Sequence, residues 1–191
     1  MHKDELNILA FASAGAFQTW LAKNRSKSTG IWLRFFKKAS GRKTVTYSEA
    51  LDAALCYGWI DGLVKSYHDH SYLQRFTPRR PKSLWSKRNR QHAARLIKTK
   101  RMQPAGLKAI QAAKRDGHWQ AAYDSPSKMA IPKDFLKELS RNARAKAFFA
   151  TLNKINTYAI AWRLQTAIRP QTREKRMKAI LEMLASGKKL H

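Results

Sequence analysis

The chain has 191 residues, of which 39 are Lys or Arg and only 12 are Asp or Glu, so its formal net charge is +27. Hydrophobic residues make up 43% and aromatic residues 10%, a composition that excludes an intrinsically disordered chain. Such an excess of positive charge favours contact with an anionic macromolecule, and the alternative reading is a generally basic protein whose charge only keeps it soluble.

The first 77 residues mix predicted strands and helices. Bulky, β-prone runs predict strands at residues 8–11, 31–36, 59–67 and 72–77, and the last two read as a hairpin. Ser13 is a typical N-cap residue and predicts a helix after it. Thr46 with Glu49 three residues later predicts a capping box at the start of the next helix, which Gly58 ends. The run at residues 31–36 is bulky throughout, which predicts a buried strand.

Two prolines interrupt the pattern after the hairpin. Pro78 and Pro81 predict a stiff, extended connector that presents Arg79 and Arg80. Ser83 then predicts the cap of a helix that runs to about residue 100, and a further helix is expected from residue 104 to about residue 117.

The remainder of the chain is predicted to be helical. Apolar residues recur at helical spacing around residues 135–139, 148–152, 158–165 and 177–184, and Gly187 is a typical helix terminator. Strands and helices therefore do not alternate regularly, which predicts an α+β fold with a small, mostly antiparallel sheet and a C-terminal helical module. We expect an α+β domain at residues 1–122, a Pro/Ser linker at 123–131 and a helical module at 132–191.

The N-terminus and the cysteine content bear on the compartment. Residues 1–6 carry two acids where a signal peptide needs positive charge, and no apolar run is long enough to span a membrane. Cys56 is the only cysteine, so an internal disulfide is impossible and an oxidising compartment is unnecessary. These features predict a cytoplasmic protein.

The most unusual stretch lies between Asp69 and Asp116, where 46 residues contain 14 Lys and Arg and no carboxylate. Arginine and lysine side chains on one ridge are suited to phosphate groups. We therefore predict non-enzymatic binding of an anionic partner, with nucleic acid as the leading candidate. A solvated basic helix face remains the alternative. The predicted anion-binding residues are Arg75, Arg79, Arg80, Lys82, Lys87, Arg88, Arg95, Lys98 and Arg101.

An alternative function is a small-molecule-binding protein or enzyme with a tryptophan-lined pocket. Its candidate residues are Trp32, Trp59, Asp61 and Trp85, beside Arg75. The competing interpretation pairs Asp61 with Arg75 as a structural ion pair. The sequence indicates no catalytic residue and no cofactor. His68 and His70 have a spacing compatible with a metal but lack further ligands nearby, so no metal site is predicted.

Three motifs suggest a family. Residues 30–35 (Gly-Ile-Trp-Leu-Arg-Phe), 58–62 (Gly-Trp-Ile-Asp-Gly) and 74–82 (Gln-Arg-Phe-Thr-Pro-Arg-Arg-Pro-Lys) resemble the bacteriocin-protection family called YdeI or OmpD-associated, as do residues 158–167 and 187–190. The resemblance implies a bacterial origin, a role in envelope stress and tolerance of cationic antimicrobial peptides, with a possible envelope-associated partner. It implies no established enzyme activity and no catalytic residues.

Overall fold

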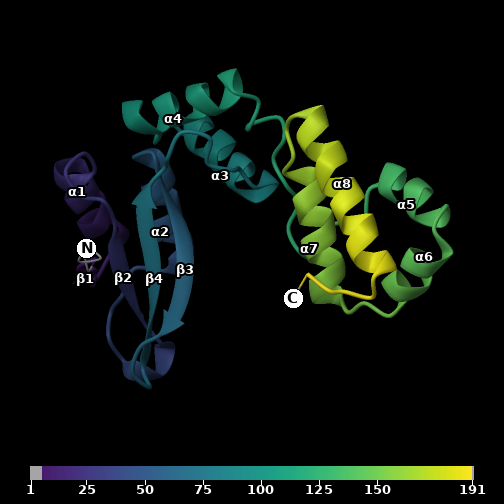
Figure 1. Ribbon diagram of the computed structural model, residues 1–191. Helices are drawn as coiled ribbons and strands as arrows, with labels where there is room; N and C mark the ends of the chain where they lie inside the picture. Colours follow the sequence, from purple (N-terminus) through teal and green to yellow (C-terminus); the bar gives the residue numbers. More distant parts are fainter. Residues whose placement is uncertain (1–5, 191) are drawn as a thin grey trace, which may run out of the picture. The chain divides into compact units, whose positions relative to one another are not determined.

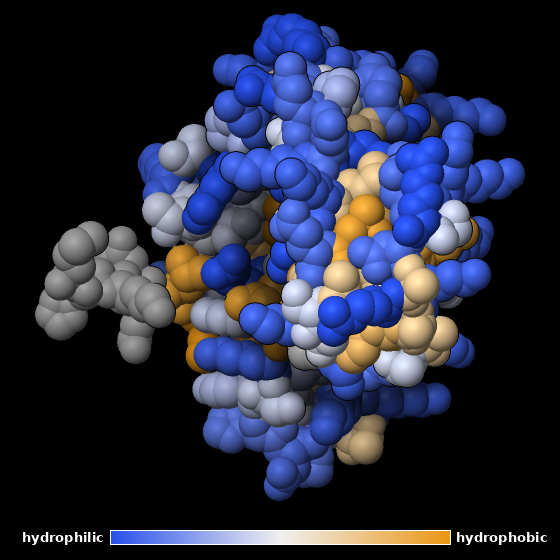
Figure 2. All heavy atoms as spheres, turned by 45° about the vertical axis from the view of Figure 1, so that its right-hand side comes forward, coloured by the Kyte–Doolittle hydropathy of each residue, from blue (hydrophilic) through white to orange (hydrophobic). Residues whose placement is uncertain are grey.

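The computed structural model describes residues 6–190, and these divide into two compact units. The acidic residues near the N-terminus, on which the prediction against a signal peptide depends, lie outside the described residues. The first unit comprises the chain up to Ser83 together with Gln91–Ala113, and the second comprises Leu84–Arg90 together with the chain from Lys114 onward. On the face displayed in Figure 2 most surface side chains are hydrophilic, and hydrophobic side chains gather in patches between them.

The first unit is built on a sheet of four strands in the order β1-β2-β4-β3. The strands are β1 (Ile8–Leu9), β2 (Ile31–Phe36), β3 (Trp59–Ser66) and β4 (Ser71–Pro78). Only β1 and β2 are parallel, while β4 pairs antiparallel with both β2 and β3. The predicted hairpin is therefore confirmed, and β3 forms an edge of the sheet with a bulge between Asp61 and Val64.

Helices α1 (Ala14–Asn24) and α2 (Tyr47–Cys56) cover one face of this sheet (Figure 1). Both begin as the sequence predicts, with the Ser13 hydroxyl accepting from the Ala16 N–H and the Thr46–Glu49 capping box complete. Their buried side chains meet the inward residues of the strands in one core, which contains Phe17, Leu21, Ile31, Leu33, Phe35, Val45, Ala50, Ala53, Ala54, Trp59 and Phe76.

Helices α3 (Lys87–Lys98) and α4 (Pro104–Arg115) follow. The predicted cap is displaced by one turn, because the hydroxyl of Ser86, not Ser83, accepts from the Asn89 N–H at 3.0 Å. Ser83 instead donates its N–H to Arg80 and closes a turn, so the connector after β4 bends and does not run extended. Lys82 has a φ of 65° within this turn, a conformation that glycine adopts more readily.

The second unit contains four further helices: α5 (Lys133–Ser140), α6 (Ala143–Ala150), α7 (Lys154–Gln165) and α8 (Pro170–Ala185) (Figure 1). Their core is formed by Phe135, Leu139, Ala145, Ile160, Leu164, Ile180 and Leu184. Gly187 adopts a φ of 67° directly after α8, which is the left-handed geometry of a helix terminator. The predicted α+β fold, with a mostly antiparallel sheet and a C-terminal helical region, is confirmed.

Candidate functional site

The face of the sheet opposite α1 and α2 is lined by aromatic and cationic side chains. In β2 burial alternates, with Ile31, Leu33 and Phe35 buried in the core and the residues between them only half-buried. Because side chains alternate across a strand, those intervening residues point to the other face. We call this second surface the outer sheet face. Its defining residues are Trp32, Arg34, Phe36, Arg42, Lys65, Tyr67 and Arg75.

Arg34 occupies the centre of a stack of rings and cations on the outer sheet face. Its guanidinium carbon lies 4.5 Å from the ring centroid of Phe36 and 5.0 Å from that of Tyr67. Arg42 adds a second cation at 5.1 Å from the Phe36 ring. The Nε of Arg34 also donates to the hydroxyl of buried Ser71 at 3.1 Å, which fixes the plane of the guanidinium. Cation–π contacts of this kind contribute about 0.5–1 kcal/mol each at exposed sites.

A second pair lies beside the first. The Nζ of Lys65, on β3, lies 4.4 Å from the ring centroid of Trp32, on β2. Between these strands lies Leu73 of β4, whose cross-strand neighbours are Arg34 and Lys65 and which is fully buried. Long cationic side chains can cover an apolar residue with their methylene stems while their charged ends stay in water. The outer sheet face therefore has a buried apolar centre beneath a charged surface.

Arg75 belongs to the same face, because it is the cross-strand partner of Trp32. Its Nε is buried and has no hydrogen-bond partner among the described residues. Asp61 does not supply one: it is the cross-strand partner of Phe76 and so points to the opposite face. There the Asp61 carboxylate accepts from the Tyr47 hydroxyl at 2.7 Å. The interpretation that pairs Asp61 with Arg75 is therefore replaced by an Asp61–Tyr47 hydrogen bond.

Of the remaining pocket candidates, Trp32 and Trp59 lie in the first unit, on opposite faces of its sheet, and Trp85 lies in the second unit. Trp59 is 1% exposed in the core, with its ring 5.7 Å from that of Trp20, and its indole N–H donates to the Arg25 carbonyl. Trp32 lies on the opposite face of the sheet. Trp85 belongs to the second unit, where its ring lies 4.8 Å from that of Trp119. Trp32 and Trp59 therefore do not line a common pocket.

Several predicted anion-binding residues already have an acidic partner. Asp52 on α2 is buried, and its Oδ1 lies 2.6 Å from Nη2 of Arg95 and 2.9 Å from Nδ1 of His92, both on α3. Nη1 of Arg101 lies 3.8 Å from the other carboxylate oxygen. Burial alone raises the pKa of Asp52, but the hydrogen bonds from Arg95 and His92 outweigh it and hold that pKa below its usual value. In the second unit, Lys87 pairs with Asp124 at 2.9 Å.

The other predicted cations are distributed over several elements. Arg88 and Lys98 are exposed on α3, and no acid pairs with either in the described part of the chain. Arg80 and Lys82 are exposed in the turn after β4, and Arg79 is half-buried with its N–H bonded to the Gly58 carbonyl. Some of the predicted anion-binding residues therefore contact a carboxylate, namely Lys87, Arg95 and Arg101. Arg88 and Lys98 contact none in the described part of the chain.

Arg34, Arg42 and Lys65 were missed by reasoning on charge density, because they lie outside the long carboxylate-free stretch. The signal for Arg34 is the period-two alternation of residues 31–36, where Trp32, Arg34 and Phe36 share one face. That alternation also corrects the prediction of a buried strand, since β2 is buried on one face only. Among residues 6–190, no ion pair joins a carboxylate to Arg34, Arg42, Lys65 or Arg75.

Among the described residues no group of three or more His, Cys, Asp and Glu side chains is arranged to hold a metal ion. Over the same part of the chain, no helix combines the length and the apolar character needed to cross a bilayer.

Two parts of the chain match known protein families. Residues 9–109, just over half of the chain, match a family described as a domain of unknown function (DUF8412), and this match includes the whole outer sheet face. Residues 128–187 match the family described as bacteriocin-protection, YdeI or OmpD-associated, which confirms the predicted resemblance over the helical C-terminal segment. The three N-terminal motifs lie in the first match instead. No curated protein and no solved structure matches the chain. The chain therefore belongs to the DUF8412 family, and its C-terminal segment matches the family described as bacteriocin-protection, YdeI or OmpD-associated.

Proposed function

We propose that this protein binds nucleic acid on the outer sheet face, as a non-enzymatic protein acting in the cytoplasm. The observation that carries the proposal is a set of four cations on this face: Arg34, Arg42, Lys65 and Arg75. The first three lie over an aromatic ring, and none of the four pairs with a carboxylate among residues 6–190. Surface cations that only promote solubility do not require planar partners. This arrangement is therefore more specific than the net charge alone.

The geometry suits phosphate groups. A cation–π contact uses the flat side of a guanidinium and leaves its in-plane N–H donors available, and those donors bind phosphate oxygens in pairs. Ser71 holds Arg34 through Nε, so the two terminal nitrogens remain for a ligand. Preorganisation of this kind lowers the entropy that binding costs.

The same face offers surfaces for bases. Aromatic rings and guanidinium planes exposed on a sheet are the groups on which unpaired bases stack, whereas a duplex keeps its bases stacked inside. Trp32, Phe36 and Tyr67 are half-buried, so each residue retains some accessible surface. The proposed ligand is therefore single-stranded nucleic acid. The exposed Arg80 and Lys82 add positive charge beyond the end of β4.

The family match supplies the setting. The C-terminal segment belongs to a family described by bacteriocin protection, so nucleic-acid binding would contribute to that tolerance indirectly. Direct capture of cationic peptides is disfavoured, because a protein of net charge +27 repels them.

A salt-dependent titration tests the proposal. The anisotropy of labelled single-stranded RNA and of duplex DNA of equal length is measured against protein concentration, up to about 150 mM salt. Four phosphate contacts predict a log–log slope of about −3 for the single strand. Binding that disappears at this salt, or that is equally weak for both ligands, would overturn the proposal.

The matched variants are two double substitutions that remove the same charge. Arg34→Gln with Lys65→Gln changes the outer sheet face, and Lys137→Gln with Arg144→Gln changes exposed positions on α5 and α6. The first pair is expected to weaken single-strand binding at least tenfold and to reduce the slope by about 1.4. The second pair is expected to have little effect. Equal losses from both pairs would show that only net charge matters.

A further inference from the structure

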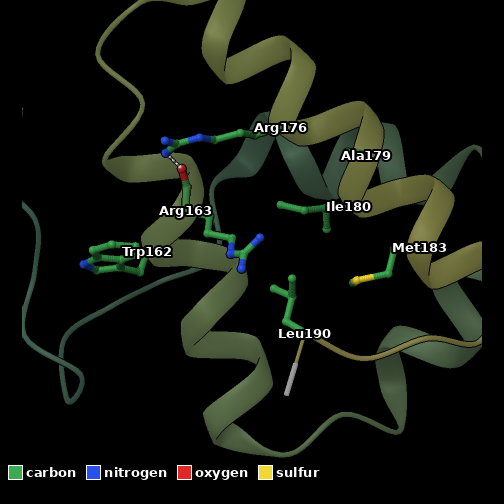
Figure 3. Close-up of a pocket in the computed structure, with 7 residues that line it drawn as sticks. All are labelled: Trp162, Arg163, Arg176, Ala179, Ile180, Met183 and Leu190. Carbon is green, nitrogen blue, oxygen red and sulfur yellow. Dashed lines mark hydrogen bonds between the residues drawn. The ribbon is translucent and has the colours of Figure 1, made fainter. Parts of the chain in front are cut away.

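The helical C-terminal segment contains a pocket of about 400 Å³ between α7 and α8. Figure 3 shows that it combines apolar side chains from α8 with arginine side chains from both helices. Ile180, Met183 and Leu190 turn toward the space that the guanidinium of Arg163 enters (Figure 3). The volume lies in the range of small-molecule sites.

One arginine of this pocket is held in place. Nη1 of Arg176 donates to the carbonyl of Arg163 at 2.8 Å and to the hydroxyl of Thr166 at 3.3 Å (Figure 3). This contact ties α8 to the end of α7, and the described residues provide no hydrogen-bond partner for the other nitrogens of the Arg176 guanidinium. Arg163 itself is exposed, and in the described part of the chain no carboxylate pairs with either arginine.

The other part of the pocket is apolar. Ile180 is 3% exposed, and Met183 and Leu190 are half-buried, so the pocket has an aliphatic floor beside two cations. Methionine and leucine side chains adapt to flexible aliphatic groups. A ligand that satisfies both parts carries one negative charge next to a short hydrocarbon tail.

We propose that this pocket binds a medium-chain carboxylate, with the carboxylate on Arg163 and the tail over Ile180, Met183 and Leu190. All of these residues except Leu190 lie in the segment that matches the bacteriocin-protection, YdeI or OmpD-associated family. The proposal is independent of nucleic-acid binding, because its residues and its ligand are different.

Calorimetry with octanoate on the full-length protein tests this, and octanol serves as the uncharged control. Octanoate is expected to bind at least tenfold more tightly than octanol, because the charge-assisted bonds to arginine are lost in the alcohol. Shifts of the Ile180 and Met183 methyl signals in NMR spectra would locate the tail. Equal affinity for the alcohol, or no binding, would overturn the proposal.

Three variants separate this site from general attraction to a basic protein. Arg163→Gln is expected to weaken octanoate binding about tenfold. Ala179→Phe fills the pocket from an exposed position and is expected to abolish binding while the melting temperature stays unchanged. Arg144→Gln on α6 removes the same charge elsewhere and is expected to have no effect. Octanoate that binds Ala179→Phe as tightly as the parent protein would show that the carboxylate binds elsewhere.

Discussion

Nη2 of Arg95 lies 2.6 Å from Oδ1 and 2.7 Å from Oδ2 of Asp52, so a single guanidinium nitrogen of α3 contacts both carboxylate oxygens of a buried acid on α2. His92, one turn earlier on α3, contacts the same carboxylate. These contacts fix α3 against α2 within the first unit. Arg95 therefore has a structural role, and its charge is largely compensated.

Asp52→Asn is expected to destabilise the protein by about 2 kcal/mol. Removing one partner of a buried ion pair costs about 3–5 kcal/mol, and the lower figure applies because the Arg95 side chain is about half exposed. The free energy of unfolding is measured with urea. Asp69→Asn, at an exposed position in the β3–β4 turn, is the control and is expected to change it by less than about 0.5 kcal/mol. An equal effect of both substitutions would contradict a special role for Asp52.

The contribution of Asp52 depends on pH in a definite direction. Its pKa in the folded protein is lowered, so the stabilisation is fully present above the unfolded value of about 3.9 and is lost as pH falls through the lower folded value. The difference in unfolding free energy between the parent protein and Asp52→Asn should not decrease from pH 7 to pH 5 and should shrink below about pH 4. A difference that already decreases between pH 7 and pH 5 would contradict this assignment.

Arg95 should contribute more to the free energy of unfolding than Arg88 and Lys98, the two exposed cations of α3. Arg95→Gln is expected to lower the free energy of unfolding by about 1–2 kcal/mol, because it leaves Asp52 without its main partner. Arg88→Gln and Lys98→Gln remove the same charge from exposed positions and should change it by less than about 0.5 kcal/mol. Thermal unfolding of the three variants checks this. Any test of anion binding by α3 should therefore use Arg88 and Lys98.

Gly106→Ala on α4 is expected to be strongly destabilising. A Cβ at this position would lie 2.5 Å from the Cys56 carbonyl oxygen and 2.7 Å from that of Leu55, and it would also overlap the Met102 sulfur. Backbone atoms cannot move aside easily, so α4 would be displaced from the end of α2 at a cost of about 2–3 kcal/mol. Gly41→Ala, in an open turn at a φ of 65°, separates conformational strain from crowding and should cost only about 1 kcal/mol.

Trp32→Leu tests the contribution of stacking on the outer sheet face. Leucine keeps an apolar side chain in β2 but removes the aromatic plane, so single-strand affinity should fall about tenfold while duplex affinity changes little. Anisotropy titrations of both ligands, with the melting temperature as a check on folding, measure this. Equal losses for single strand and duplex would indicate that Trp32 supports the fold and not the ligand.

Much of the local structure could be predicted from the sequence. The Ser13 cap, the Thr46–Glu49 capping box and the terminator at Gly187 depend on residues within a few positions of each other, so their signals are complete in a short segment. The one displaced cap, Ser86 in place of Ser83, lies after a turn in which Lys82 adopts a left-handed conformation, and no local pattern predicted that geometry.

The sequence by itself determined the charge excess, the order of strands and helices, and the helical character of the C-terminal segment. Only the tertiary structure decided which cations remain available. Asp52 and Arg95 are 43 residues apart, and the register of β2 with β4 places Arg75 beside Trp32. A cation is compensated or exposed according to what lies within a few ångströms of it, because the electrostatic interaction decreases with distance and is screened by water and salt. Sequence spacing does not contain those distances.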